Sequence, residues 1–303
     1  MSKPFSIAIL LFFVKNLSVF VVFLLVCAGF GFAAAAAVVG KADAQSEKIV
    51  RYRVDGGDVF YGIVAGKEIR QLTNSFAEIA GGKRDFSGKR HILNKVKLLA
   101  PVEPSKVICF GWTFPSHARE VGGEEQRKEP LVFLKPPSVI IAEKEAIVLP
   151  RKLSNQVEFE GELAAVIGKC MRNVTPEQAM AGIFGFTCIN DVTARDLTKT
   201  DPQFTRGKGF DTFGPLGPWV VTQLDPSDLR LQTILNGQVK QNAKISDMTF
   251  DIPFLVSYIS QVMTLLPGDV IAFGTPGGSG PLKAGDTIQV KIEKIGLLTN
   301  FVK

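Results

Sequence analysis

Histidine and cysteine are scarce in this chain. Only two of its 303 residues are histidine and only four are cysteine. Two histidines cannot build a His-rich metal site, so any metal that the protein binds has to be held by carboxylates. Four cysteines in this length cannot form a disulfide scaffold, and we expect Cys109, Cys170 and Cys188 to be packing residues. A mean hydropathy of +0.19 excludes an intrinsically disordered chain.

The net positive charge of the chain is also small when residues 1–44 are not counted. The formal net charge is +6, and Lys3, Lys15 and Lys41 against Asp43 give residues 1–44 a net charge of +2. The remaining +4 is spread over the rest of the chain, which is too weak and too diffuse for a nucleic-acid footprint. No nucleic-acid partner is therefore expected.

The N-terminus carries a long apolar run. The 25 residues 16–40 contain no charge, and as a helix they would span roughly 37 Å, more than a hydrocarbon core of about 30 Å. Ala42-Asp43-Ala44 follows, so residues 1–44 are interpreted as a cleaved secretory signal or an uncleaved membrane anchor. Either one predicts an exported or membrane-anchored protein. A mis-called start would instead predict a cytoplasmic one, although the next methionine after Met1 is Met171.

Beyond this leader, short apolar runs are broken by glycine, proline and aspartate. Residues 45–100 are predicted to form a small N-terminal domain of strands with one short helix, beginning with a hairpin that turns at residues 55–58. Pro101 and Pro104 mark its end, and residues 101–303 form the larger domain. Strands are predicted there at 107–111, 131–134, 146–149, 163–167, 219–221, 231–235, 270–273 and 287–292.

Two helices are expected among these strands. Thr175 is placed to cap the first. The second is predicted over 253–266, with an apolar stripe of Phe254, Val256, Ile259, Val262, Met263 and Leu266. Few helices among many short strands predict a β-rich α+β fold.

Two carboxylates lie two residues apart in Glu160-Gly161-Glu162. In a strand such residues face the same side, and Gly161 between them allows a close approach. Neighbouring carboxylates repel unless a cation neutralises them, so an acidic pair at the start of an apolar run suggests a site of the Mg²⁺ type. Asp191, after the buried run 183–189, could add a third carboxylate. A solvated strand start is the alternative for this segment, and Glu158 is expected to stay in solvent.

Lys208 and His117 are the other candidates for chemistry. Lys208 has a glycine on each side, which would let its ammonium approach a ligand, although the spacing of a P-loop is missing. His117 and Glu120 share a face on a helical turn, so the carboxylate could orient the imidazole as a general base. This spacing is also common by chance, and a purely structural role is the alternative. The GTPGGSG segment at 274–280 is, alone, only a glycine-rich turn.

Taken together, these stretches resemble the fumarylacetoacetate hydrolase family. Each phrase alone is weak, but the ordered set is specific and covers residues from about 50 to 303. It is most similar to the bacterial branch with a short N-terminal domain. The matching phrases are KVICFG (106–111), PLVFLKPP (130–137), EGELAAVIG (160–168), NDVTARD (190–196), RGKGFDTFGPLGP (206–218), PGDVIAFGTP (267–276) and KAGD (283–286).

The resemblance implies a mixed β-roll or β-sandwich catalytic domain and a homodimer. It also implies a bound Mg²⁺ or Mn²⁺ that is chelated by a 2-oxo acid substrate. It also implies a role for each candidate residue. These are Glu160, Glu162 and Asp191 as metal ligands, His117 with Glu120 as the base, Lys208 for developing oxyanion charge, and Arg195 and Thr275 for the substrate carboxylate.

Three positions depart from the family pattern. Thr113-Phe114 stand where Asn-Tyr is usual, and Thr198 stands where a glutamine is common. These changes remove hydrogen-bonding reach near the distal part of the substrate, so the resemblance supports the reaction core more than any named substrate. Gln203 could compensate.

The leading hypothesis is metal-dependent hydrolysis of a carbon–carbon bond in a 2,4-dioxo acid such as an acylpyruvate or fumarylpyruvate. The same site could instead decarboxylate oxaloacetate, or isomerise or hydrate a hydroxydienoate. An alternative that is not an enzyme is an exported binding module whose site has decayed. The candidate residues are all intact, which argues against this alternative. A membrane-tethered interaction protein is a further alternative, which residues 1–44 alone support.

Overall fold

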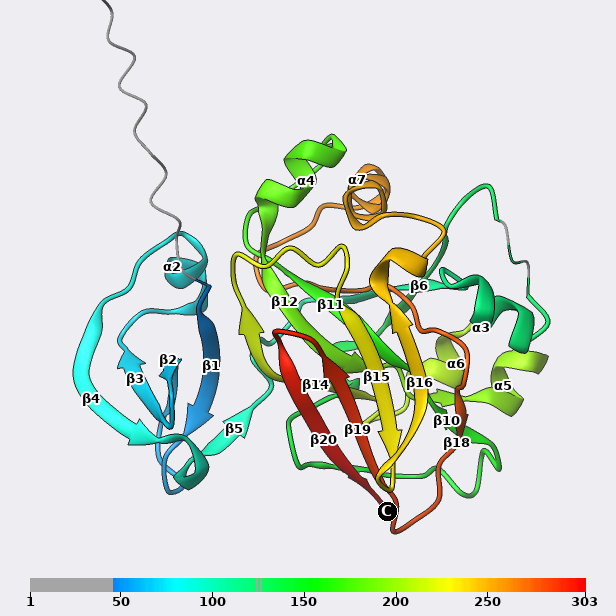
Figure 1. The fold of residues 1–303 in the computed structure, drawn as a ribbon, viewed down its shortest axis with the longest axis horizontal. Coiled ribbons are helices and arrows are strands. Elements are labelled where there is room, and N and C mark those ends of the chain that lie inside the picture. The colour runs from blue at the N-terminus through cyan, green and yellow to red at the C-terminus, as the bar shows by residue number, and fades with distance from the viewer. Residues whose placement is uncertain (1–45, 124, 126) are drawn as a thin grey trace, which may run out of the picture. The chain divides into compact units, whose positions relative to one another are not determined.

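The computed structural model describes residues 46–303 except residues 124 and 126. The described residues form one compact unit, which is coloured in Figure 1. The predicted signal or anchor, residues 1–44, lies outside the described residues. Within the part that the structure describes, no helix has both the length and the apolar character needed to span a bilayer.

A 12-stranded sheet runs through this unit. The predicted hairpin is present as β1 (Lys48–Arg53) and β2 (Val59–Ala65), and β1 also pairs with β14 (Gly214–Val221), so the N-terminal strands continue the sheet of the larger domain. The order is β4-β3-β2-β1-β14-β12-β11-β17-β6-β7, with β5 beside β1 and β8 beside β14. The other strands are β3 (Glu68–Leu72), β4 (Phe86–Ile92), β5 (Lys97–Leu99), β6 (Val107–Gly111), β7 (Leu131–Lys135), β8 (Ile140–Ile141), β11 (Gly161–Ile167), β12 (Ile183–Asn190) and β17 (Val270–Ala272).

Two smaller sheets complete the β structure. The five-stranded one has the order β16 (Gln238–Lys244), β15 (Arg230–Leu235), β19 (Thr287–Ile292), β20 (Gly296–Val302) and β9 (Ala146–Ile147). The three-stranded one consists of β13 (Thr193–Ala194), β10 (Val157–Phe159) and β18 (Gly280–Pro281). The α-helices of the described residues are α2 (Phe76–Ala80), α3 (Pro115–Glu120), α4 (Pro176–Gly182), α5 (Arg195–Thr200), α6 (Thr205–Lys208) and α7 (Ile252–Val262).

Strand β11 lies at the centre of the core, with all seven of its residues buried. Leu163 and Ala165 pack into the cluster that also holds Leu231 and Val290 of the five-stranded sheet. Ala164, one step along the strand, faces a second buried cluster on the other side. A strand covered on both faces has no alternation of polar and apolar residues, as its sequence predicts. The strand-rich α+β fold is confirmed, and the domain boundary near residue 100 stays a prediction.

The helix predictions are confirmed in part. Thr175 caps α4, and its side chain accepts from the backbone N–H of Gln178. Helix α7 instead begins after Asp251, which caps it, and ends at Val262, so the predicted end at 266 is wrong. Its buried face includes Leu255, Val256 and Ile259. Three side chains of the predicted apolar stripe are instead exposed, namely Phe254, Val262 and Leu266. The predicted stripe mixed two faces because apolar side chains lie on the exposed face of α7 as well as on the buried one.

Candidate active site

Three buried carboxylates meet where β10 gives way to β11. Glu160 and Glu162 flank the first residue of β11, and the register pairs Gly161 with Asn190 on β12. Asp191 follows that strand, and its backbone N–H donates to the carbonyl of Glu160 at 2.8 Å. One oxygen from each of the three side chains lies within 4.8 Å of the others. The structure thus brings together the three carboxylates that the sequence singled out.

The two glutamates have opposite electrostatic environments. Burial raises the pKa of Glu160, but the charges of Lys208, Arg195 and His117 outweigh burial and hold that pKa below its ordinary value. Burial also raises the pKa of Glu162, and the charges of Asp191 and Glu160 raise it further. Among the described residues, Glu162 has one hydrogen-bond partner, the backbone N–H of Gly274 at 2.7 Å. It is therefore the carboxylate that lacks a cation.

The donor set fits a divalent metal ion. The three carboxylates present only oxygen atoms, which hard cations such as Mg²⁺ and Mn²⁺ prefer. Within the part of the chain that the structure describes, ion pairs join three cations to Glu158, Glu160 and Asp191. These cations are Lys135, Lys208 and Arg195. Glu162 remains as one uncompensated buried charge, which is the feature that a bound cation would correct.

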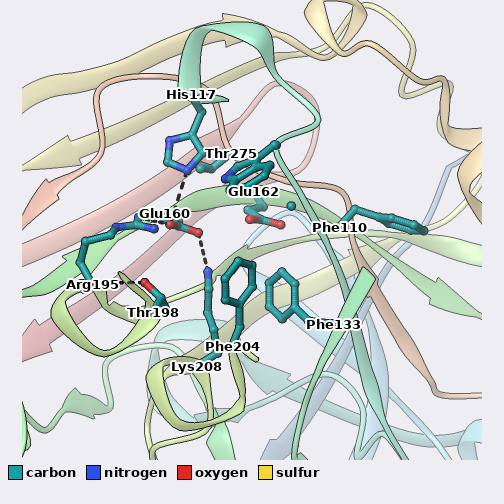
Figure 2. A pocket seen from close by; sticks show the side chains of 12 residues that line it. Phe110, His117, Phe133, Glu160, Glu162, Arg195, Thr198, Phe204, Lys208 and Thr275 are labelled. Atoms are coloured by element: carbon teal, nitrogen blue, oxygen red, sulfur yellow. Dashed lines mark hydrogen bonds and ion pairs between the residues drawn. The ribbon is translucent and has the colours of Figure 1, made fainter. Parts of the chain in front are cut away.

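The Lys208 ammonium reaches the carboxylate of Glu160, as Figure 2 shows. Its ammonium donates to Glu160 at 2.7 Å and to Asp191 at 2.6 Å. Burial lowers the pKa of Lys208, but the two carboxylates outweigh burial and keep it above its ordinary value. Lys208 is therefore a cation held at the centre of the site, where developing negative charge on a substrate would meet it.

Sequence reasoning missed Lys135 and misjudged Glu158. Lys135 is fully buried on β7 and donates to Asp191 at 2.6 Å and to the carbonyl of Val192. Glu158, on β10, is buried rather than solvated. Its carboxylate accepts a hydrogen bond of 2.8 Å from the guanidinium of Arg195. A lysine that ends the apolar run of a strand was the available signal for Lys135, since lysine is almost never buried unless it is paired.

Replacing Lys135 with methionine is expected to lower the free energy of unfolding by about 3 kcal/mol, because Asp191 then keeps a buried charge with one of its two lysines gone. Urea unfolding in the presence of a chelator measures this. The matched control is Lys97→Met, which removes an exposed ammonium 2.7 Å from Glu145 and should cost less than about 1 kcal/mol. Equal losses for the two variants would contradict a structural role for the buried pair.

His117 and Glu120 share one face of α3, as predicted. His117 is buried, and its Nδ1 lies 3.5 Å from Glu120, at the outer limit of a hydrogen bond. Its Nε2 lies 3.7 Å from Glu160, so the imidazole points at the carboxylate cluster (Figure 2). Glu120 also accepts from the backbone N–H of Gly278 at 3.0 Å. The hydrogen bond to His117, followed in weight by those from the backbone, lowers the pKa of Glu120 despite its partial burial.

Arg195 and Thr275 line the same pocket. The guanidinium of Arg195 bonds both Glu158 and Glu160. The hydroxyl of Thr275 donates to the carbonyl of Gly161 at 2.8 Å. Both side chains are therefore held in place by neighbours, and their roles in binding a substrate carboxylate stay predictions.

Aromatic side chains also line this pocket. Phe133 and Phe204 form an edge-to-face pair with ring centroids 5.4 Å apart, and Phe133 lies under the Lys208 ammonium at 4.9 Å. Trp112, which also lines the pocket, has a positive φ of 56°, an uncommon conformation for a bulky residue. Phe204 could not be found from spacing, because the exposed loop before α6 has no periodicity that reveals its facing.

The three departures from the family pattern lie in different places. Thr113 and Phe114 point into the interior, where the Thr113 hydroxyl donates to the carbonyl of Phe273 at 2.6 Å and Phe114 joins the core. Thr198 lines the pocket, and its hydroxyl donates to the carbonyl of Arg195 at 3.1 Å. Gln203 is exposed and is absent from the pocket lining described above, so the expectation that it compensates has no contact to support it.

The fold and this site define a class of enzyme with a buried carboxylate cluster, able to hold a metal ion, beside a histidine–glutamate pair. Residues 106–303 match the family model described as the C-terminal domain of fumarylacetoacetate (FAA) hydrolase, and residues 47–101 match the Rv2993c-like N-terminal domain. The chain belongs to the fumarylacetoacetate hydrolase family, whose members are enzymes that act on carbon–carbon bonds.

The chain is similar to proteins of known sequence or structure that are named for different activities. Protein Rv2993c of Mycobacterium tuberculosis is 48% identical over 240 residues, which are 78% of this chain and 90% of that protein. Oxaloacetate tautomerase YisK of Bacillus subtilis is 37% identical over 270 residues, 84% of this chain and 90% of that protein. The structure of a maleylpyruvate hydrolase from Sphingobium sp. SYK-6, in complex with manganese(II) and pyruvate, is 30% identical with a TM-score of 0.70 and covers 84% of this chain and 98% of its own.

Proposed function

We propose that the protein is a divalent-metal-dependent hydrolase that cleaves a carbon–carbon bond in a 2,4-dioxo acid of the acylpyruvate type. One observation carries this proposal: the imidazole of His117, backed by Glu120, faces Glu160 at 3.7 Å, so a candidate base adjoins the carboxylate cluster. A base must lie within reach of the proton that it removes, directly or through one water.

Glu160, Glu162 and Asp191 would hold Mg²⁺ or Mn²⁺. When bound, such an ion acts as a Lewis acid that polarises the 2-oxo group of the substrate. The manganese and pyruvate in the Sphingobium enzyme, a relative in the same family, support this assignment. The choice between Mg²⁺ and Mn²⁺ belongs to the proposal as well, because both ions accept the same all-oxygen ligands.

The chain's own residues account for the proton and the charge. His117 takes a proton from water, and the hydroxide oxygen bonds to C4 of the substrate. The C3–C4 bond then breaks and its electron pair passes to C3. The proton that His117 took from water is then delivered to C3, which gives pyruvate beside the released carboxylic acid. Lys208 stabilises the enolate charge that develops, and Arg195 with Thr275 orients the substrate carboxylate. Glu120 keeps His117 in the orientation and tautomer that accept a proton at Nε2.

Tautomerisation of a short 2-oxo dicarboxylic acid is the second candidate. The tautomerase relative of Bacillus subtilis favours it, since 84% of this chain aligns with that protein. This reaction needs only a proton moved between C3 and the 2-oxo oxygen, and a base at the position of His117 could serve it without an attacking water. Decarboxylation of oxaloacetate and isomerisation of a hydroxydienoate remain the further reactions that the same site could carry.

An assay of four substrates separates these reactions. The purified protein is given acetylpyruvate, fumarylpyruvate, oxaloacetate or a hydroxydienoate, each with Mg²⁺ and again after complete chelation. We expect acylpyruvate cleavage with Mg²⁺ and a loss of at least about 100-fold on chelation, since the ion stabilises several kcal/mol of transition-state charge. Activity that survives complete metal removal would refute the metal-dependent mechanism, and turnover of oxaloacetate alone would favour the tautomerase or the decarboxylase.

A further inference from the structure

Gln241 is a buried polar residue that the proposed reaction leaves without a role. It lies on β16 with no exposed surface, and its amide makes three hydrogen bonds. Its Oε1 accepts from the backbone N–H of Gly161 at 3.0 Å. Its Nε2 donates to the Thr275 hydroxyl at 2.8 Å and to the carbonyl of Pro276 at 2.6 Å. One side chain therefore joins two segments that are far apart in the sequence.

The first segment is the strand start that carries two of the proposed metal ligands. Gly161 separates Glu160 from Glu162, so a bond to its N–H fixes the backbone between them. A Cβ at position 161 would overlap the hydroxyl of Thr233 on β15. Strand β15 is therefore in direct contact with the backbone of Gly161. The five-stranded sheet thus sets the position of the carboxylate pair through direct contact with Gly161.

The second segment is the loop at residues 274–279, which reaches both halves of the site. At one end, the N–H of Gly274 donates to Glu162 at 2.7 Å. At the other end, the N–H of Gly277 donates to the Ser116 hydroxyl at 3.0 Å, and the N–H of Gly278 donates to Glu120 at 3.0 Å. Ser116 and Glu120 belong to α3, the helix that carries the proposed base. The loop is therefore a hydrogen-bonded connection between the metal ligands and that helix.

We propose that Gln241 is a positioning residue that sets the distance between the carboxylate cluster and the His117–Glu120 pair. It is absent from the pocket lining, so it acts through the 274–279 loop and through Gly161 and does not touch substrate. The expected effect of Gln241 on catalysis rests on the proposed function. Its expected effect on the 274–279 loop does not depend on that function. Shifts of about 1 Å in a catalytic group can cost about 100-fold in rate, which is the scale of the expected effect.

Hydrogen exchange tests the structural part without any substrate. In Gln241→Met, amide exchange of residues 274–279 and of α3 should accelerate at least about 10-fold, because the loop loses two of its anchors. The control Gln289→Met removes an amide from β19 in the same sheet, where its Nε2 bonds Thr299 at 3.2 Å, and should leave both segments unchanged. If Gln241→Met fails to fold, Gln241→Asn keeps a buried amide that is too short to span both segments. Unchanged exchange in the loop of the folded variant would overturn the proposal.

A double-mutant cycle tests the catalytic part. Gln241→Met should lower kcat by about 10- to 100-fold while KM changes by less than about 3-fold, because the substrate contacts remain. Since Gln241 and Glu120 are linked by the loop, adding Glu120→Gln should cost much less in the Gln241→Met background than in the wild type. Fully additive losses would show that Gln241 does not act on the pair and would overturn the proposal. If the wild-type protein turns over none of the four acids, the proposed function fails while the exchange result still decides the role of Gln241.

Discussion

Replacing His117 with glutamine should lower the kcat of acylpyruvate hydrolysis by about 10²- to 10⁴-fold, the usual contribution of a general base. Glutamine keeps a polar side chain of similar reach but cannot accept a proton at neutral pH. The carboxylates that would hold the metal are unchanged, so the Kd for Mn²⁺ should stay within about 3-fold of the wild-type value. Steady-state kinetics with acetylpyruvate and a direct Mn²⁺ titration measure the two quantities.

The other histidine of the chain provides the control. His91 lies on β4, where its Nε2 bonds the Gln71 side chain at 2.9 Å, and His91→Gln should leave both kcat and metal binding unchanged. A His117→Gln variant that hydrolyses at the full rate would show that His117 is not the base. The same variant assayed with oxaloacetate adds a discrimination, because decarboxylation without an attacking water could tolerate the substitution.

Replacing Glu162 with glutamine should abolish metal binding. The substitution keeps an oxygen for the N–H of Gly274 but removes the one carboxylate of the cluster that no described cation neutralises. Loss of groups that merely support metal ligands typically costs 10- to 100-fold in metal affinity, so loss of a ligand charge should cost about 100-fold or more. The melting temperature without metal should rise, because a buried and unpaired charge has been removed. A Mn²⁺ titration and a thermal melt in chelator test both expectations.

Glu143 offers a matched control for that substitution. It is a partly buried carboxylate whose pKa is raised by burial, and it accepts from a backbone N–H, that of Thr299 at 2.8 Å. Glu143→Gln should therefore reproduce the chemical change without touching the carboxylate cluster, and Mn²⁺ affinity should be unchanged. A Glu162→Gln protein that binds Mn²⁺ as tightly as the Glu143→Gln protein would remove Glu162 from the proposed ligand set.

Much of this site could be predicted from the sequence because its residues lie in short, regular segments. The two-residue period of a strand brings Glu160 and Glu162 to one side, and the helical spacing brings His117 and Glu120 to one face. Asp191 was found because it follows a buried run that had to be a strand. In each case local geometry, together with the family resemblance, fixed the facing of the side chain.

What the sequence could not supply depends on contacts between distant segments. Lys135 pairs with Asp191 across 56 residues, and Gln241 bonds Gly161 across 80, so neither partner is visible from local spacing. Glu158 was expected in solvent because only the fold brings Arg195 to it. The face of α7 was misassigned for a local reason, since apolar side chains such as Phe254 and Val262 also lie on its exposed face. The leader at residues 1–44 and the export that it implies stay predictions.

A crystal of the protein soaked in Mn²⁺ tests the central claim most directly, because manganese is located by its anomalous scattering. The account predicts one strong anomalous peak within coordination distance of oxygens from Glu160, Glu162 and Asp191, accompanied by displacement of the Lys208 ammonium from between Glu160 and Asp191. A fully occupied manganese elsewhere, with Lys208 still bound to both carboxylates and no peak among the three, would contradict it.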